Sequence, residues 1–376
     1  MNSDNRFNRR QQLALGTVIM LSPALRLFPS QSVIMAGRAS WLCAAAAVPL
    51  LLAWLYFMSS FMSHRQSGEG LPEFILRTLG PIAGKITLAV LSLWFLIYGG
   101  FVLRSGADRF IVTIYPSSGP AAFSVTMGLI ALAAVLKKPR TMVRFARIVK
   151  PVLMGVLFLV AFFSLFSLDF SNLLPITVHD VMPVMRGSVM AVDVVASAVF
   201  YICMLEGGCT DGSAGHFGVF SRWLTGSCLL LTMLSVIIVG SFGADLCVRL
   251  TKPFFALVRN LVFFKTVERV EALVVMLWIF PDFLLVSAVL YSAQYCLRLI
   301  FGKDPTYNGE RLTDFSGGRW VIWLCCAVCV AASLFIAPTP ASLDFWSATI
   351  VPYVSLAIFF VLLPLVYAAG RMRKSI

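Results

Sequence analysis

The feature that most constrains this chain is a series of hydrophobic stretches, each long enough to cross a lipid bilayer. A membrane-spanning helix needs about 20 mostly apolar residues, and the sequence contains ten such stretches. Their approximate limits are 12–30, 37–62, 84–114, 119–136, 147–168, 187–206, 219–245, 268–300, 320–337 and 345–369. We therefore expect an all-α polytopic membrane protein with about ten transmembrane helices.

The composition excludes an ordinary soluble protein. Of the 376 residues, 59% are hydrophobic and only 12% are charged, whereas soluble domains carry about a quarter charged residues. We expect one transmembrane domain over residues 1–370 and a short basic tail over 371–376. No cleavage site closes the first apolar stretch, so we expect the first span to be retained.

Neither a metal site nor a catalytic motif is found in the sequence. The nine cysteines are scattered, and Cys325, Cys326 and Cys329 lie in an apolar run without the spacing of a zinc site. The three histidines fall in predicted loops, and no phosphate-binding or nucleophile-elbow motif is present. The sequence therefore predicts no enzyme, no metal and no cofactor.

The net charge of +13 reflects membrane topology and not a nucleic-acid surface. Lys and Arg gather at the ends of spans, and an N-terminus inside the cell places most of the 30 on the inner side. The inner residues are Arg6, Arg9, Arg10, Arg65, Arg77, Lys85, Lys137, Lys138, Arg140, Arg144, Arg147, Lys150, Arg222, Arg298, Lys303, Arg311, Arg319, Arg371, Arg373 and Lys374. Both termini are therefore expected to be cytoplasmic, and nucleic acid is not an expected partner.

The first span contains the unusual stretch LSPALRLFPS, residues 21–30. Pro23 removes a backbone donor and disfavours helical geometry at Ser22. In transporters of the LeuT type, such breaks form the binding site, and Arg26 inside a span is costly unless it faces a cavity or a carboxylate. The alternative is a simple kink at Pro23 with Arg26 extending outward to the membrane surface.

The sixth span offers a partner for this break, because a two-repeat transporter has a matching irregular helix at the start of its second half. Asp193 lies in the outer half of this span and is a candidate partner for Arg26, although an Asp near a helix start also stabilises the helix dipole. Glu206, followed by Gly207 and Gly208, is either a residue of the inner end or part of a pathway.

Three further features carry charged residues. Arg104 and Asp108 are four residues apart on the third span and can form a structural pair, with Asp108 also a candidate for coupling. Asp282 follows Pro281 and either lines a pathway or caps the helix after a kink. The connection 245–271 mixes apolar and charged residues, which predicts an amphipathic helix at the outer membrane interface.

Several stretches, in order along residues 10–370, resemble the permease-like B-subunit family of spore germinant receptors, within the amino acid-polyamine-organocation superfamily. They are LRLFPS, LPEFILRTLGPIAGKI, RFARIVKP, DFSNLLPI, VMPVMRGS, VERVEALVVMLWIF and YSAQYCLRLIFG. The resemblance implies a LeuT-type fold of two inverted five-helix repeats, about 12–168 and 187–369, with helices 1 and 6 interrupted.

The same resemblance implies a function, partners and a site. It implies a place in the spore inner membrane, an A-type membrane subunit and a C-type lipoprotein as partners, and recognition of a small germinant such as an amino acid. The family's glycine-containing stretch in span one falls on Ser22, Pro23 and Ala24, and its acidic position in span six falls near Ile202. Both depart from the family pattern, so Arg26 becomes the expected contact for an anionic group.

Three functions remain open from the sequence. The first is a germinant receptor subunit that senses a small solute and triggers germination. The second is a secondary transporter of amino acids or organic solutes, coupled to protons through Asp193 or Asp282. The third is a membrane scaffold for partner subunits.

Overall fold

The computed structural model describes residues 7–66, 69–113, 119–137, 139–209, 217–250, 252–260, 274, 276–301 and 319–373. In these ranges the chain is helical apart from short connections, and its only extended pairing is an isolated bridge between Phe7 and Cys209. The predicted all-α class is confirmed. Residues 302–318 and most of the connection after Asn260 lie outside the described residues.

The α-helices up to the sixth predicted span are α1 (Arg9–Arg26), α2 (Phe28–Ala36), α3 (Cys43–Ser63), α4 (Leu71–Leu79), α5 (Pro81–Thr113), α6 (Pro120–Val135), α7 (Pro139–Ser164) and α8 (Val181–Met204). The later helices are α9 (Phe217–Phe242), α10 (Ala244–Arg249), α11 (Pro253–Asn260), α13 (Ile279–Ile300), α14 (Arg319–Phe335), α15 (Pro340–Phe345), α16 (Val351–Ala357) and α17 (Leu363–Met372). Two π-helical turns, Trp346–Ile350 and Ile358–Leu362, join α15, α16 and α17.

Seven helical stretches of the described chain are long and apolar enough to cross a membrane. They are Phe28–Ser63, Pro81–Val112, Pro139–Ser167, Val178–Met204, Phe217–Phe242, Ile279–Ile300 and Pro340–Met372. The shorter apolar helices Pro120–Val135 and Trp320–Phe335 match the fourth and ninth predicted spans. The stretch Phe28–Ser63 turns at Gly37, which has a positive φ of 52°, so α2 continues the first predicted span and α3 forms the second.

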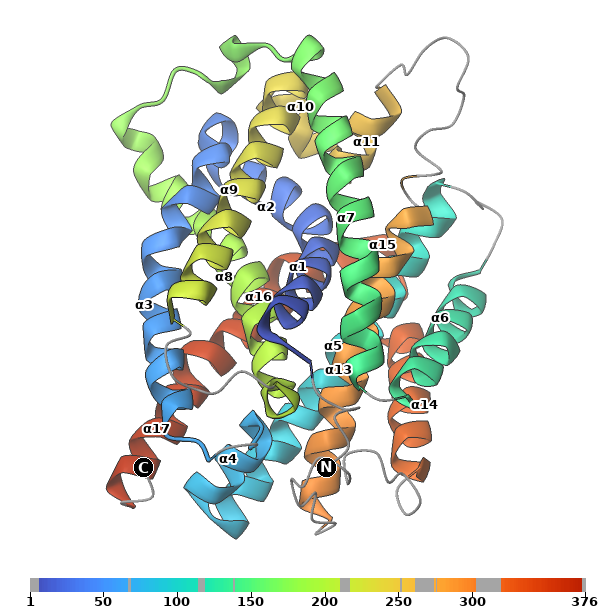
Figure 1. Ribbon diagram of the computed structural model, residues 1–376. Helices are drawn as coiled ribbons and strands as arrows, with labels where there is room; N and C mark the ends of the chain where they lie inside the picture. The colour runs from blue at the N-terminus through green and yellow to red at the C-terminus, as the bar shows by residue number, and fades with distance from the viewer. Residues whose placement is uncertain are drawn as a thin grey trace.

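The helix α1 lies at the centre of the bundle (Figure 1). It packs against α7, α8 and α13, and every residue from Gln12 to Arg26 is buried. Its start is capped by Asn8, whose side chain accepts a hydrogen bond from the Gln11 backbone N–H at 2.9 Å. An apolar helix that also carries Arg9 and Arg26 is therefore enclosed by protein, where polar partners are available.

The break in the first span lies at Leu27. Ser22, Pro23 and Ala24 belong to the continuous helix α1, and α2 starts at Phe28. The Leu27 backbone N–H still donates to the Pro23 carbonyl at 2.8 Å. The interruption thus falls inside the predicted stretch but after the three residues that are predicted to form it.

The predicted interruption of the sixth span is displaced to its end. The helix α8 is continuous to Met204, and the departure from α-helix comes in the 3₁₀ turn Glu206–Gly208. Two consecutive glycines at this point weaken the helix. The irregular backbone therefore begins where α8 itself ends, at the buried residue Glu206.

The two ends of the bundle are distinct (Figure 1). The helices α4 and α17 contact each other at one end, whereas α10 and α11 contact α2 at the other. We call these the α4 end and the α10 end. Within its described part, the connection 245–271 is not the predicted single helix but two short ones, α10 and α11. Leu250 is extended, and Pro253 starts the second helix.

Close helix packing in the bundle depends on small residues. A Cβ atom placed on Gly100 of α5 would lie 2.6 Å from the Cβ atom of Ala332 and 3.0 Å from two backbone atoms of α14. Only glycine allows the two backbones to approach this closely. On the same interface, the Cys329 thiol donates to the Leu96 carbonyl at 3.4 Å, so this cysteine acts as a buried packing residue.

Candidate functional site

The carboxylate of Asp282 joins three helices inside the bundle. Its Oδ1 accepts a hydrogen bond from the Ser22 hydroxyl of α1 at 2.5 Å, and its Oδ2 lies 3.0 Å from Nη2 of Arg109 on α5. The Arg109 and Asp282 side chains are only 3% and 5% exposed. Asp282 lies in the first turn of α13 after Pro281, where the helix dipole also favours a negative charge. We call Ser22, Arg109 and Asp282 the Asp282 cluster.

Arg26 lies one turn after Ser22 on α1 and is 7% exposed. Its guanidinium carbon is 4.9 Å from the centre of the Phe101 ring, and the Tyr98 hydroxyl of α5 is close by. Among the described residues, no carboxylate forms an ion pair with the Arg26 guanidinium, and the Tyr98 hydroxyl is its hydrogen-bonding neighbour. The alternative in which Arg26 extends outward to the membrane surface is therefore wrong, because packing of α1 in the bundle centre encloses the side chain.

Asp193 of α8 faces the same region but does not form the predicted ion pair with Arg26. Its carboxylate accepts a hydrogen bond from Ser197 at 3.4 Å and another from Ser355 of α16. Arg26 is near enough to interact electrostatically with both Asp193 and Asp282. Side chains from α5, α8 and α13 thus surround the Arg26 guanidinium of α1. The carboxylate of Asp193 is bound by the hydroxyl groups of Ser197 and Ser355.

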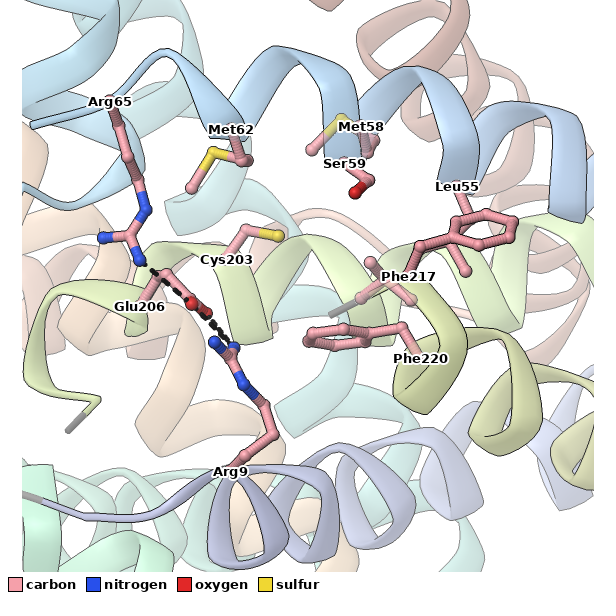
Figure 2. A pocket seen from close by; sticks show the side chains of 11 residues that line it. Arg9, Leu55, Met58, Ser59, Met62, Arg65, Cys203, Glu206, Phe217 and Phe220 are labelled. Carbon is pink, nitrogen blue, oxygen red and sulfur yellow. Dashed lines mark hydrogen bonds and ion pairs between the residues drawn. The ribbon is translucent and has the colours of Figure 1, made fainter. Parts of the chain in front are cut away.

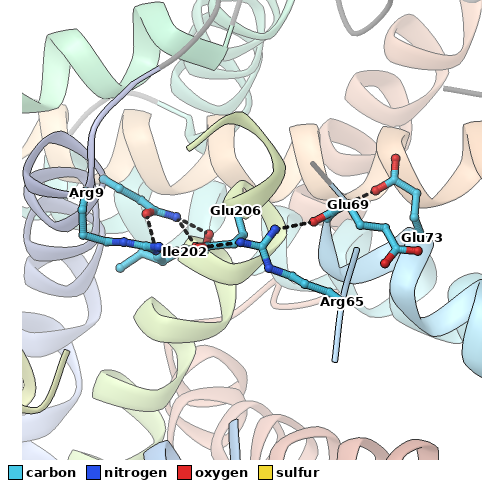
Figure 3. A network of polar contacts seen from close by, with 8 residues as sticks. Arg9, Arg65, Glu69, Glu73, Ile202 and Glu206 are labelled. Carbon is cyan, nitrogen blue, oxygen red and sulfur yellow. Dashed lines mark hydrogen bonds and ion pairs between the residues drawn. The ribbon is translucent and has the colours of Figure 1, made fainter. Parts of the chain in front are cut away.

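A second polar network lies toward the α4 end and is centred on Glu206 (Figures 2 and 3). Its carboxylate is 2.6 Å from Nη1 of Arg9 and 3.2 Å from Nη2 of Arg65. Gln12 donates through Nε2 to Glu206 at 2.8 Å and to the Ile202 carbonyl at 3.0 Å. We call Arg9, Gln12, Arg65 and Glu206 the Glu206 network; it ties the start of α1 to the ends of α3 and α8.

Ile202 is a packing residue of the contact between α1 and α8. Its side chain is fully buried, and a Cβ atom on Gly16 would clash with its Cδ1 atom. The side chain therefore occupies the space that glycine leaves free on α1. One turn after Ile202, Glu206 binds Arg9 and Gln12 at the start of α1.

The Glu206 network continues into α4 (Figure 3). Arg65 donates to the Glu69 carbonyl at 2.7 Å, and the Glu69 carboxylate pairs with Arg77 at 2.8 Å. Glu73 accepts from the Gly70 backbone N–H at 2.6 Å and interacts with the Tyr295 hydroxyl of α13, while burial raises the pKa of Glu73 to about 7. The contacts link α3, α4 and α8 at this end of the bundle.

This second network is not predicted from the sequence, where membrane topology alone explains Arg9, Arg65 and Arg77. The available signal is the spacing of Arg9 and Gln12, which places two polar side chains on one face at the start of an apolar helix. Polar residues on the buried face of such a helix need partners, and Glu206 supplies one.

A small cavity adjoins the Glu206 network (Figure 2). Its volume is about 50 Å³, and its lining residues are Arg9, Leu55, Met58, Ser59, Met62, Arg65, Val199, Cys203, Glu206, Phe217 and Phe220. A cavity of about 10–15 Å³ by this measure holds one water molecule. The space beside Glu206 thus suits a few waters and is too small for an amino acid.

The predicted pair of Arg104 and Asp108 does not form. Arg104 instead donates to the Ala337 carbonyl at 2.8 Å, and Asp108 is 2.5 Å from Nζ of Lys252. The two side chains diverge because each finds a partner in a different segment, the loop after α14 for Arg104 and the connection of α10 with α11 for Asp108. Asp108 therefore serves as a link at the α10 end.

The sequence and the fold both match known proteins. The profile of the family described as spore germination protein matches residues 10–340. In Bacillus subtilis (strain 168), the spore germination protein YndE is 23% identical over 252 residues, which cover 65% of this chain and 67% of YndE. The putative spore germination protein YfkT from the same strain is 22% identical over 298 residues, which cover 78% of this chain and 80% of YfkT.

Among solved structures, the chain is similar to Mhp1, a nucleobase-cation-symport-1 family transporter, in a closed conformation with bromovinylhydantoin bound. The TM-score is 0.58 at 14% identity, and the match covers 96% of this chain and 82% of that chain. A match at this identity establishes the fold, and it confirms the predicted LeuT-type architecture. The chain is an integral membrane protein that belongs to the spore germination protein family.

Proposed function

We propose that this protein is the ligand-sensing membrane subunit of a spore germinant receptor, and that Arg26 binds an anionic group of a small germinant. The observation that carries this proposal is the buried guanidinium of Arg26, which has the Tyr98 hydroxyl beside it and forms no ion pair with any carboxylate of the described chain. A guanidinium stays protonated in proteins, and the neighbouring Tyr98 hydroxyl is neutral. Because a buried charge that forms no direct ion pair costs several kcal/mol, a carboxylate of a bound solute in contact with Arg26 would lower the free energy.

The residues around Arg26 suit a small zwitterion such as an amino acid. Asp193 is hydrogen-bonded by the hydroxyls of Ser197 and Ser355, so its carboxylate is an acceptor for the ammonium group of the same ligand. The Phe101 ring that lies against Arg26 and the neighbouring Tyr98 supply apolar contact for a side chain. Under this proposal, the two charged groups of the ligand bind to α1 and α8.

The resemblance to germinant receptor subunits extends the proposal to partners and location. We place the protein in the inner membrane of the spore with both termini in the cytoplasm, in a complex with an A-type membrane subunit and a C-type lipoprotein. This orientation puts the α4 end on the cytoplasmic side. It is testable with cysteine labelling from either side of the membrane.

Thermal unfolding of the purified protein with a panel of amino acids tests the site. A ligand that binds only the folded protein raises its stability, by about 2.7 kcal/mol at a concentration 100 times the Kd. We expect stabilisation by amino acids but not by their amides or methyl esters, and we expect it to disappear in Arg26→Gln. The matched control is Arg38→Gln, because Arg38 is exposed. Equal stabilisation of wild type and Arg26→Gln would place the ligand elsewhere.

The transporter function is the second candidate, and the fold shared with Mhp1 favours it. Uptake of labelled amino acid into proteoliposomes, with and without a proton gradient, separates the two functions. Uptake that depends on Asp193 and Asp282 would favour a transporter. Binding without uptake, together with spores whose germination response is lost in Arg26→Gln, would favour a receptor.

A further inference from the structure

An apolar groove lies between α6, α7 and α13. Its volume is about 340 Å³, and its lining residues are Met127, Ile130, Ala134, Thr141, Met142, Phe145, Ile279, Phe280 and Phe283. Three aromatic rings make one wall: the Phe145 ring centre is 5.7 Å from that of Phe280 and 5.6 Å from that of Phe283. Of the lining residues, Thr141 alone has a polar side chain, so the groove suits a hydrocarbon chain and not a soluble polar ligand.

One end of the groove is bordered by a strongly basic segment. The sequence from 137 to 150 contains the basic residues Lys137, Lys138, Arg140, Arg144, Arg147 and Lys150, and it has no Asp or Glu between Asp108 and Asp169. Lys137, Arg144 and Arg147 are exposed. The segment therefore presents concentrated positive charge without acidic residues nearby in the chain.

Two of the basic residues follow groove residues closely in the chain. Lys137 lies just after the end of α6, and its backbone N–H donates to the Ala134 carbonyl at 3.1 Å. Thr141, in the first turn of α7, is three residues before Arg144, so these two lie within one helical turn. Long basic side chains reach along a helix to the membrane surface while their stems stay on apolar surface. A phosphate at this end of the groove is thus within reach of several cationic groups.

We propose that this groove binds one acyl chain of an anionic phospholipid whose phosphate group is held by Lys137, Arg144 and Arg147. The apolar lining matches the acyl chain, and the exposed basic residues at its end match the charge of the headgroup. Basic pockets between transmembrane helices bind anionic lipid headgroups by the same physical attraction. The groove is separate from the proposed germinant site, since its lining includes none of Arg26, Tyr98, Phe101 and Asp193.

Lipid retention measured by native mass spectrometry tests the proposal on the purified full-length protein. The probes are phosphatidylglycerol and phosphatidylcholine with identical acyl chains, added back after delipidation. We expect retained phosphatidylglycerol in wild type and a roughly tenfold or greater loss in the triple variant Lys137→Gln, Arg144→Gln and Arg147→Gln, because each basic residue near an anionic headgroup contributes roughly fivefold in affinity. Phosphatidylcholine binding should be weak and unchanged.

Two further variants distinguish a lipid from other occupants. The control Arg38→Gln, Arg186→Gln and Arg222→Gln removes the same charge from exposed positions elsewhere and should retain phosphatidylglycerol. The variant Ala134→Phe fills the groove without changing the charge, so it should no longer retain phosphatidylglycerol. An unchanged thermal unfolding temperature of each lipid-free variant shows that the fold is intact.

The proposal is overturned if phosphatidylglycerol and phosphatidylcholine are retained equally, or if the control loses as much lipid as the triple variant. It is also overturned if soluble glycerol phosphate stabilises the protein as much as the lipid does, because the basic residues would then bind a free anion. Retention that is unaffected by Ala134→Phe would overturn it as well, since the acyl chain would then lie outside the groove.

Discussion

The hydroxyl oxygen of Ser22 lies 2.5 Å from the Oδ1 atom of Asp282, which joins α1 to the first turn of α13 across 260 residues of sequence. The start of α1 is held separately, through Arg9 and Gln12, by Glu206 at the end of α8. Arg9 and Ser22 are separated by about 20 Å along the helix, at about 1.5 Å per residue. The central helix is thus connected near each of its ends to a different helix of the second half of the chain.

Removing the charge of Asp282 should destabilise the protein, because Arg109 is then left buried without its anionic partner. We expect Asp282→Asn to lower the free energy of unfolding by about 3–5 kcal/mol. Ser22→Ala, which removes one neutral partner, should cost about 1–3 kcal/mol. Denaturant unfolding in detergent measures both.

The double variant Arg109→Gln with Asp282→Asn provides the control for the ion pair. We expect it to be more stable than the sum of the two single variants predicts, since the charges are removed together. Strict additivity of the two single effects would contradict a direct interaction between Arg109 and Asp282.

Glu206→Gln should loosen the attachment of α1 at the α4 end, since Arg9 and Arg65 would face each other without a carboxylate between them. Cys203 lines the cavity beside Glu206, so its reactivity reports on opening. In a chain whose other cysteines are replaced by alanine, we expect Cys203 to react at least several-fold faster with a small maleimide in Glu206→Gln than with Glu206 intact. Ser59→Ala, a change in the same cavity without charge, should leave the rate unchanged.

Two glycine substitutions should differ in cost for a geometric reason. In Gly100→Ala, the new Cβ atom meets the Ala332 Cβ atom at 2.6 Å and backbone atoms of α14 at 3.0 Å, and backbone cannot rotate away. In Gly16→Ala, the new Cβ atom comes closest to the Cδ1 atom at the end of the Ile202 side chain. That side chain can change rotamer.

We therefore expect Gly100→Ala to lower the free energy of unfolding by about 1–3 kcal/mol or more, as overpacking does. Gly16→Ala should lower it by less. Combining Gly16→Ala with Ile202→Val should recover part of the loss, whereas no recovery would contradict the contact between these two residues. Thermal unfolding of wild type and the three variants provides the comparison.

The pH dependence of stability should contain a contribution from Glu73. Burial raises the pKa of this carboxyl from 4.5 to about 7, so between these values the folded protein holds a proton that the unfolded chain releases. The stability that Glu73 contributes is present below about pH 4.5 and is lost as the pH rises through about 7. A shift of this size corresponds to about 3 kcal/mol.

Glu73→Gln removes the titration and keeps an oxygen acceptor for the Gly70 N–H. Relative to wild type, the variant should therefore become more stable as the pH is raised from about 5 to about 8. The unfolding temperatures of both proteins are measured across this range. A difference between them that stays the same at every pH would contradict the raised pKa of Glu73.

The sequence by itself determined the helices and the identity of several polar residues in the bundle. A helix in lipid satisfies its own backbone hydrogen bonds, so its presence depends on a local run of apolar residues, and the predicted spans correspond to helices wherever the chain is described. Charged residues inside such runs stand out for the same reason, which is why Arg26, Asp193 and Asp282 are recognisable as unusual from the sequence.

Which of these residues contact one another was decided only by the tertiary structure. The sequence predicts a pair of Arg26 with Asp193, yet Asp193 is held by hydroxyl groups, and Asp282 binds Ser22 and Arg109. Asp108 binds Lys252 and not Arg104. A hydropathy pattern has a range of about 20 residues, whereas these contacts join helices up to 260 residues apart. Which of these contacts form depends on how the helices pack, because packing determines which charged groups share the same buried space.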